Sequence, residues 1–242
     1  MNLVIDIGNT RIKAAVFKDN TLMDLRFFVN TDELLASKEL ITSCQSAIIG
    51  TVVDNVTDFN SKLNTIIPTR LFQATTPIPL KNCYESVATL GSDRIAASIG
   101  AYTLYPNCNV LVIDTGTCIK YNFTNSNNEY LGGGISPGLQ MRFKALHQFT
   151  SKLPLIVFNS EIIDLIGNTT QQSILSGVVK GSVAEIDCII TEYKQQFTDL
   201  VCVITGGDSE YLCKQLKNSI FANQNLVLKG LNDILNYNLE NK

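Results

Sequence analysis

Two stretches of the sequence place an aspartate directly before a glycine-containing turn. They read LVIDIGNT at residues 3–10 and LVIDTGTC at residues 111–118, and five of their eight positions match. In each stretch the apolar run predicts a strand that delivers a carboxylate to the edge of a sheet, and the next residues predict a tight turn. Such a turn can aim backbone N–H groups and a threonine hydroxyl at phosphate oxygens. Its aspartate can hold a hydrated Mg²⁺. The pair of motifs therefore predicts a polyphosphate site.

A third glycine motif, VITGGDS at residues 203–209, follows later in the chain. It predicts a strand, a Gly-Gly turn and a helix, and the turn would let the backbone approach a flat ligand such as adenosine closely. The P-loop pattern GxxxxGK[ST] and the dinucleotide pattern GxGxxG are both absent from the sequence. A further glycine-rich stretch, GGGISPG at residues 132–138, is interpreted as a strand end with close backbone packing.

Candidate residues for binding and activating a substrate lie in the stretch YESVATLGSDRIAASIGAY at residues 84–102. Asp93 and Arg94 come at the start of a predicted helix, where the helix dipole favours a negative charge. Asp93 is therefore compatible with a structural role at the helix terminus. It is equally compatible with a general base beside an arginine that binds an anionic substrate.

The elements that position these residues form a repeated plan. Residues 2–6 and 12–18 predict one β-hairpin, and residues 110–114 and 119–124 predict another, which indicates an internal duplication. The remaining elements expected are a buried strand at 46–53, helices at 56–66, 92–105 and 173–197, a strand-turn-helix unit at 200–216, and a short strand followed by a helix at 226–238.

The composition is that of a globular protein with one large domain or two of roughly 120 residues. The 242 residues are 45% hydrophobic and 17% charged, with a net charge of −3 and no run of lysine or arginine. We therefore expect no nucleic-acid partner. Without a signal peptide or a long apolar segment we also expect no membrane partner, and a cytoplasmic protein. The seven cysteines contain no CxxC pair, and the single histidine, His147, gives no support to a hydrolase triad.

Taken in order, the two hairpins and the Gly-Gly turn resemble the sugar kinase, heat-shock protein 70 and actin superfamily. That resemblance implies an α/β protein with two ribonuclease-H-like domains, the actin-like ATPase fold, and an active site in the cleft between them. The domains expected are residues 1–108 and 109–242.

Within that superfamily the sequence resembles the type III pantothenate kinases. The matching segments are DIGNTRIK (6–13), LGSDR (90–94), DTGT (114–117), YLGGGISPGL (130–139), TTQQSILSGVVKG (169–181), ITGGDS (204–209) and LVLKGL (226–231). The resemblance implies ATP-dependent phosphorylation of pantothenate to 4'-phosphopantothenate, the first step of coenzyme A biosynthesis.

The resemblance also implies roles for individual residues. Asp93 matches the catalytic base, and Asp114 matches the ligand of an activating monovalent cation, K⁺ or NH₄⁺. Asp6 lies in the vicinity of Mg²⁺. The implied ATP contacts are Asp6, Ile7, Gly8, Asn9, Thr10, Arg11, Ile12, Lys13 and Thr117. The implied pantothenate contacts are Tyr84, Gly91, Ser92, Asp93, Arg94 and Thr170.

The family is homodimeric, with its substrate sites near the subunit interface. Small residues in the predicted helix at 173–197 agree with close helix packing across such an interface; they are Gly177, Gly181, Ser182 and Ala184. The sequence departs from the family after Thr117. Many relatives continue Ala-Thr-Thr-Phe-Asp, whereas this chain reads Cys-Ile-Lys-Tyr-Asn at 118–122, so that Asn122 replaces an aspartate.

Two other functions stay open from the sequence. One is a small kinase for a different hydroxylated metabolite, such as a sugar. The other is a nucleotide-bound regulator or assembly protein of the actin type, which would bind ATP without acceptor-dependent turnover.

Overall fold

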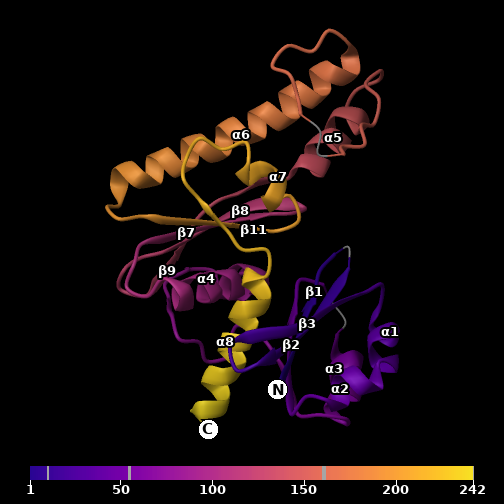
Figure 1. Cartoon of the computed structure of the whole chain (residues 1–242), viewed down its shortest axis with the longest axis vertical. Helices are drawn as coiled ribbons and strands as arrows, with labels where there is room; N and C mark the ends of the chain where they lie inside the picture. The colour runs from indigo at the N-terminus through magenta and orange to yellow at the C-terminus, as the bar shows by residue number, and fades with distance from the viewer. Residues whose placement is uncertain (10, 54–55, 160–161, 242) are drawn as a thin grey trace. The chain divides into compact units, whose positions relative to one another are not determined.

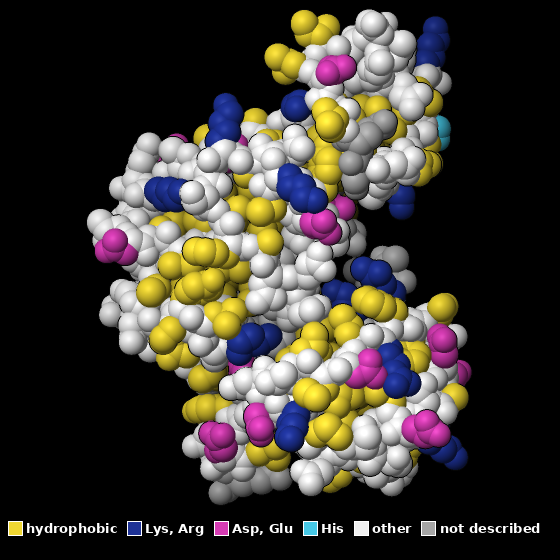
Figure 2. Space-filling view, viewed as in Figure 1, with side chains coloured by type: hydrophobic (Ala, Val, Ile, Leu, Met, Phe, Trp, Pro, Cys, Tyr) yellow, Lys and Arg dark blue, Asp and Glu magenta, His cyan; other side chains and the backbone are white. Residues whose placement is uncertain are grey.

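A computed structural model describes residues 1–9, 11–53, 56–159 and 162–241 (Figure 1). The chain divides into two compact units. The first contains Met1–Asn107, Asn127–Leu131 and Asn225–Lys242, and the second contains Cys108–Ser126 and Gly132–Gln224. On the face drawn in Figure 2, acidic and basic side chains are interspersed among apolar ones.

The sheet of the first unit has the strand order β3-β2-β1-β4-β5. Its strands are β1 (Asn2–Ile7), β2 (Ile12–Lys18), β3 (Thr21–Phe28), β4 (Ser46–Thr51) and β5 (Thr69–Leu71). The first three strands are antiparallel, whereas β1, β4 and β5 run parallel to one another. Two short strands outside this sheet, β6 (Lys81–Asn82) and β9 (Glu129–Gly132), pair in parallel with each other. The hairpin and the buried strand predicted from the sequence are confirmed.

Helices cover both faces of this sheet. Alternate residues of β1, namely Leu3, Ile5 and Ile7, pack against the helices α1 (Thr31–Ala36), α2 (Lys38–Thr42) and α3 (Thr57–Asn64). On the other face, Val4 packs against α4 (Ser92–Leu104) and α8 (Leu226–Glu240), and a single 3-10 turn, η1 (Val87–Thr89), precedes α4. Because side chains alternate along a strand, Asp6 shares the face of Val4 and α4.

The C-terminal segment corrects one expectation about secondary structure. Residues 226–238 were expected to begin with a short strand, but all of them belong to α8. A continuous helix is favoured because Leu228 and Leu231 pack on the β1 sheet and because α8 crosses α4 at two glycines. A Cβ atom on Gly230 would lie 1.7 Å from the Ala96 carbonyl oxygen, and one on Gly100 would lie 2.4 Å from the Leu226 oxygen.

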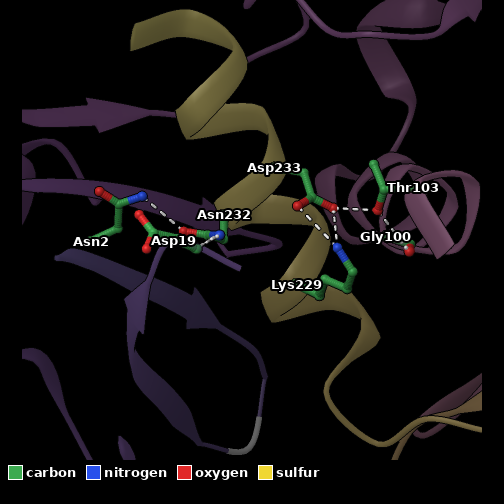
Figure 3. A network of polar contacts seen from close by, with 7 residues as sticks. All are labelled: Asn2, Asp19, Gly100, Thr103, Lys229, Asn232 and Asp233. Carbon is green, nitrogen blue, oxygen red and sulfur yellow. Dashed lines mark hydrogen bonds and ion pairs between the residues drawn. The ribbon is translucent and has the colours of Figure 1, made fainter. Parts of the chain in front are cut away.

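The same helix also changes the expected division of the chain, because α8 belongs to the first unit rather than to a domain of residues 109–242. Polar contacts tie it there (Figure 3). Asn232 accepts a hydrogen bond of 2.9 Å from Asn2 and donates one of 2.9 Å to the Asp19 carbonyl oxygen. Asp233 accepts a hydrogen bond of 2.6 Å from Thr103 on α4 and pairs with Lys229 at 2.9 Å.

The second unit is built around the other predicted hairpin. Its sheet contains the run β12-β11-β7-β8, with β10 also paired to β8. These strands are β7 (Val110–Thr115), β8 (Cys118–Thr124), β10 (Ile135–Pro137), β11 (Val201–Thr205) and β12 (Phe221–Ala222). Leu111 and Ile113 of β7 pack in a core with α5 (Leu139–Gln148), α6 (Thr170–Gln196) and α7 (Ser209–Cys213).

Two further expectations for this unit are confirmed. The long helix is present as α6, although it begins three residues earlier than residue 173 because the Thr169 side chain accepts a hydrogen bond from the Gln172 N–H and caps the first turn. The glycine-rich stretch packs closely on backbone, since a Cβ atom on Gly133 would lie 2.1 Å from the Tyr121 carbonyl oxygen. Within the described residues, no helix combines the length and the apolar character needed to cross a membrane.

Candidate active site

The first Asp-x-Gly motif forms the end of β1 and the turn into β2. The Gly8 N–H donates a hydrogen bond of 3.2 Å to the Arg11 carbonyl oxygen, which closes the turn. Asp6 is opposite Lys13 on β2 and level with Gly50 on the parallel strand β4. A carboxylate is thus presented at the carboxyl end of parallel strands, where ligands of α/β proteins bind. Thr10 lies outside the described residues.

The second motif has the same construction in the other unit. The Gly116 N–H donates a hydrogen bond of 3.0 Å to the Cys118 carbonyl oxygen. Asp114 is opposite Lys120 on β8 and level with Thr205 on the parallel strand β11. Thr117, the expected ATP contact, is exposed at the turn. The duplication predicted from the repeated octet is therefore present in the strand pairing of both hairpins.

The Gly-Gly turn adjoins this second hairpin. Gly206 has φ +96°, and a Cβ atom there would lie 2.3 Å from the Thr115 carbonyl oxygen and 2.6 Å from Asp114 Oδ1. The Thr115 hydroxyl donates to the Thr205 carbonyl oxygen at 2.9 Å, and the Asp208 N–H donates to the Thr115 carbonyl oxygen at 3.0 Å. Burial raises the pKa of the Asp208 carboxyl. The structure thus brings together the phosphate-type hairpin and the proposed adenosine turn.

The Asp114 carboxylate is engaged in an ion pair. Lys120 Nζ lies 2.9 Å from Asp114 Oδ2, and the two side chains are only 20% and 12% exposed. An added K⁺ or NH₄⁺ bound to this carboxylate would lie against a fixed positive charge, and like charges at such a distance repel. The amide at Asn122 adds no negative charge to the hairpin. These residues do not fit the monovalent cation that was expected at Asp114.

The candidate catalytic aspartate lies in the first turn of α4. Asp93 is partly buried, and its Oδ1 accepts a hydrogen bond of 2.9 Å from the Arg94 N–H. A Cβ atom on Gly91 would lie 2.7 Å from that oxygen, so glycine leaves room for the carboxylate. The Ser92 hydroxyl donates to the Thr51 carbonyl oxygen at 2.6 Å and so attaches α4 to the end of β4.

Arg94 and Tyr84, both expected to contact pantothenate, are adjacent. The Arg94 guanidinium carbon lies 5.4 Å from the centre of the Tyr84 ring, within the range of a cation–π contact. Arg94 is 5% exposed, and the Tyr84 N–H donates to Asn82 Oδ1 at 3.0 Å. The Tyr84 ring therefore holds the Arg94 guanidinium, and the hydrogen bond to Asn82 fixes the Tyr84 backbone.

A cavity of about 730 Å³ lies next to these residues in the first unit. Its lining includes Thr51 at the end of β4, Gln73 in the following loop, and Gly91 and Ser92 at the start of α4. The volume is that of a small-molecule site. Of the expected pantothenate contacts, Gly91 and Ser92 line this cavity, and Asp93 and Arg94 follow them directly in the chain.

Thr170 belongs to the other unit. It is the first residue of α6 and lines a mainly apolar cavity of about 740 Å³ together with Leu146 and Phe149. His147 is exposed on α5, where its Nδ1 lies 2.8 Å from the Leu153 carbonyl oxygen.

Lys120 and Thr51 are site residues that the motifs did not identify. A signal for Lys120 was available, because each repeated octet is followed by a lysine that an antiparallel hairpin places opposite its aspartate, Lys13 for Asp6 and Lys120 for Asp114. No local signal existed for Thr51, since its carbonyl oxygen meets a hydroxyl 41 residues away. Among the described residues, no group of three or more His, Cys, Asp or Glu side chains could hold a metal ion.

Solved structures place this architecture in a known fold class. The structure superimposes on a Campylobacter jejuni protein described as a Baf family transcriptional activator with TM-score 0.67 and 23% identity, over 98% of this chain and 99% of that chain. It superimposes on a ROK hexokinase from Thermus thermophilus with TM-score 0.56 and 12% identity, over 99% of both chains. The chain thus has the two-domain fold of the sugar kinases and actin-like ATPases.

Sequence comparison then gives the family. A family model for type III pantothenate kinases matches residues 2–192. The chain is 45% identical to a type III pantothenate kinase of Christiangramia forsetii over 98% of its own length and 99% of that protein's length. The chain belongs to the type III pantothenate kinase family.

Proposed function

We propose that the protein transfers the γ-phosphoryl group of ATP to the primary hydroxyl of pantothenate and forms 4'-phosphopantothenate, at the first step of coenzyme A biosynthesis. Family membership along nearly the whole chain carries this proposal. The site supports it, because phosphoryl transfer depends on positioning and charge stabilisation more than on covalent chemistry by the protein.

Asp93 is the proposed general base. It would accept the hydroxyl proton of pantothenate and orient the oxygen towards the phosphoryl group. It lies in the first turn of α4. The Arg94 N–H donates a hydrogen bond of 2.9 Å to one of its carboxylate oxygens and fixes the direction of that oxygen.

Arg94 and Tyr84 are proposed to bind pantothenate together with Gly91 and Ser92. A guanidinium can offer two parallel N–H groups to a carboxylate, and pantothenate carries one carboxylate. The Tyr84 ring restricts the rotation of the guanidinium, so that less side-chain entropy is lost when the substrate binds.

The first hairpin, from Asp6 to Lys13, and Thr117 of the second hairpin are the proposed ATP contacts. Their turns would offer backbone N–H groups to phosphate oxygens, and Asp6 would hold the Mg²⁺ that accompanies the nucleotide. The bound metal would offset negative charge on the phosphate oxygens. One carboxylate suffices for this purpose, because Mg²⁺ keeps most of its waters and takes substrate phosphates as ligands.

A homodimer, with Thr170 as a pantothenate contact, belongs to the same proposal. Gly177, Gly181 and Ala184 are exposed on α6, and an added Cβ atom at either glycine would meet no atom within 4 Å. A second helix could therefore approach this surface closely. The cytoplasmic location expected from the sequence stays a prediction.

A direct product assay tests the function. Purified protein is incubated with Mg²⁺, ATP and pantothenate, and 4'-phosphopantothenate is sought by mass spectrometry, with glucose and other hydroxylated metabolites as acceptors in parallel reactions. Product from pantothenate alone is the expected result. Faster phosphorylation of another acceptor would assign a different kinase activity. ATP binding with no acceptor-dependent turnover would favour a regulatory or assembly role.

A further inference from the structure

The pairing of Lys120 with Asp114 is fixed by the strand register. The two residues are directly opposite on the antiparallel strands β8 and β7, and opposite side chains point to the same face of a sheet. Their charged groups are 2.9 Å apart and mostly shielded from solvent. The contact is therefore part of the hairpin and differs from the exposed ion pair of Lys214 with Glu210, whose side chains are both 68% exposed.

The surroundings of the carboxylate restrict it further. The backbone of Gly206 lies against Asp114 Oδ1, at a position where a Cβ atom would be 2.6 Å away. The lysine ammonium holds the other oxygen, Oδ2. The Gly206 backbone thus packs against Oδ1 of Asp114, and the Lys120 ammonium group pairs with Oδ2.

The charges on this face of the hairpin are balanced. Residues 110, 112 and 114 of β7 share the face with residues 118, 120, 122 and 124 of β8, because their pairs are in register. Asp114 is the acidic residue of this set and Lys120 is the basic one, whereas Asn122 is neutral. The charge of Lys120 neutralises that of Asp114, so a bound monovalent cation would give this face of the hairpin a net positive charge.

A lysine ammonium and a free ammonium ion are chemically alike. Both carry a single positive charge and direct N–H groups towards oxygen atoms. The lysine differs in being covalently attached, so that its local concentration does not depend on the salt in solution. It lies on the hairpin that carries Thr117, one of the proposed ATP contacts.

We infer that Lys120 supplies, as a tethered ammonium group at Asp114, the positive charge that a bound K⁺ or NH₄⁺ would otherwise bring to this hairpin, so that phosphoryl transfer needs no monovalent cation. The inference rests on the proposed kinase function. It makes Lys120 a positioning residue that orders Asp114 and the phosphate hairpin.

The experiment compares turnover in potassium chloride with turnover in tetramethylammonium chloride at equal ionic strength, with 4'-phosphopantothenate measured directly. The wild-type protein should give rates that agree within about twofold. Lys120→Met, which keeps an unbranched side chain one atom shorter and removes its charge, should lose about 100-fold in turnover without potassium. Added K⁺ or NH₄⁺ should restore most of that loss. Lys120→Arg should stay insensitive to the cation, and Lys214→Met, at the exposed ion pair, should behave as wild type.

A second readout is independent of activity. The melting temperature of Lys120→Met should rise with potassium chloride relative to tetramethylammonium chloride, whereas that of the wild-type protein should not. Strong potassium stimulation of the wild-type protein would overturn the inference even if Lys120→Met fails to fold. Equal and salt-independent activity of Lys120→Met would overturn it as well. Absence of pantothenate phosphorylation in every salt would instead refute the proposed function, so the two failures are distinguishable.

Discussion

The Ser92 hydroxyl donates a hydrogen bond of 2.6 Å to the carbonyl oxygen of Thr51. This bond joins the first residue of α4 to the last residue of β4. Thr51 is level with Ile7 of β1, so the bond places the start of α4 at the sheet edge where Asp6 lies. The proposed base and the proposed Mg²⁺ ligand are therefore positioned by one strand end.

Replacing Ser92 with alanine should disturb the position of Asp93 and leave ATP binding unchanged. The loss of one partly buried hydrogen bond should lower the free energy of unfolding by about 1 kcal/mol. A slight displacement of α4 should lower kcat about tenfold or more, with the KM for ATP unchanged. Steady-state kinetics and urea unfolding measure both effects. Ser61→Ala is the matched control, because the Ser61 hydroxyl also donates to a backbone carbonyl oxygen but is exposed on α3. Equal effects of the two substitutions would contradict the role of Ser92.

Asp93→Asn tests the general base itself. The substitution keeps the shape of the side chain and removes its basicity, so kcat should fall by about 10²–10⁴-fold. Binding of ATP should be unchanged because the nucleotide contacts are elsewhere. Isothermal titration with ATP and single-turnover measurements separate these quantities. Asp58→Asn, in the first turn of α3, should have wild-type kinetics. Turnover of Asp93→Asn close to that of wild type would remove Asp93 from the catalytic role.

The sequence predicted the parts of the fold and the site that depend on local chemistry. The two hairpins could be found because a short apolar run, an aspartate and a glycine turn occur within eight residues, and the ends of β1 and β7 confirm them. The helix that carries Asp93 and Arg94 was found in the same way, from the glycine before it and the proline after it.

The features that the sequence did not predict depend on contacts between distant segments. α8 was expected to start as a strand because Leu226, Val227 and Leu228 form an apolar run, and its helical form follows from its crossing with α4 at Gly100 and Gly230. The bond from Ser92 to Thr51 arises only when α4 packs on the sheet. Lys120 could be identified once the register of the hairpin was known, although the motif alone gave no reason to select it.

Arg94 should determine the affinity for pantothenate. Arg94→Ala should raise the KM for pantothenate by about 10–100-fold, because a charge-assisted hydrogen-bonded pair with the substrate carboxylate is lost. Arg94→Lys should recover little of this loss, since lysine lacks the planar pair of N–H groups and the stacking on Tyr84. Arg26→Lys, at an exposed ion pair with Asp24, is the control. A KM for pantothenate that is the same in Arg94→Ala and wild type would exclude the pairing.

Glu185 on α6 connects that helix to the second hairpin and to α5. Its Oε1 accepts a hydrogen bond of 3.0 Å from the Tyr121 hydroxyl, and its Oε2 pairs with the Arg142 guanidinium. Burial by itself would raise the pKa of the Glu185 carboxyl, but the hydrogen bonds it accepts, that from Arg142 first among them, outweigh burial and hold the pKa below its ordinary value. Burial also raises the pKa of the Tyr121 hydroxyl, which therefore stays a donor.

These contacts predict a pH-dependent part of the stability. Because the pKa of Glu185 is lower in the folded protein, its contribution is fully present above the unfolded value, about 4.3, and is lost as the pH falls through the folded value. Glu185→Gln should lower the free energy of unfolding at neutral pH by on the order of 2 kcal/mol. The difference from wild type should shrink below about pH 4. Urea unfolding across this pH range measures it, with Glu210→Gln at an exposed ion pair as control. A difference from wild type that stays constant with pH would show that the charge of Glu185 does not stabilise the fold.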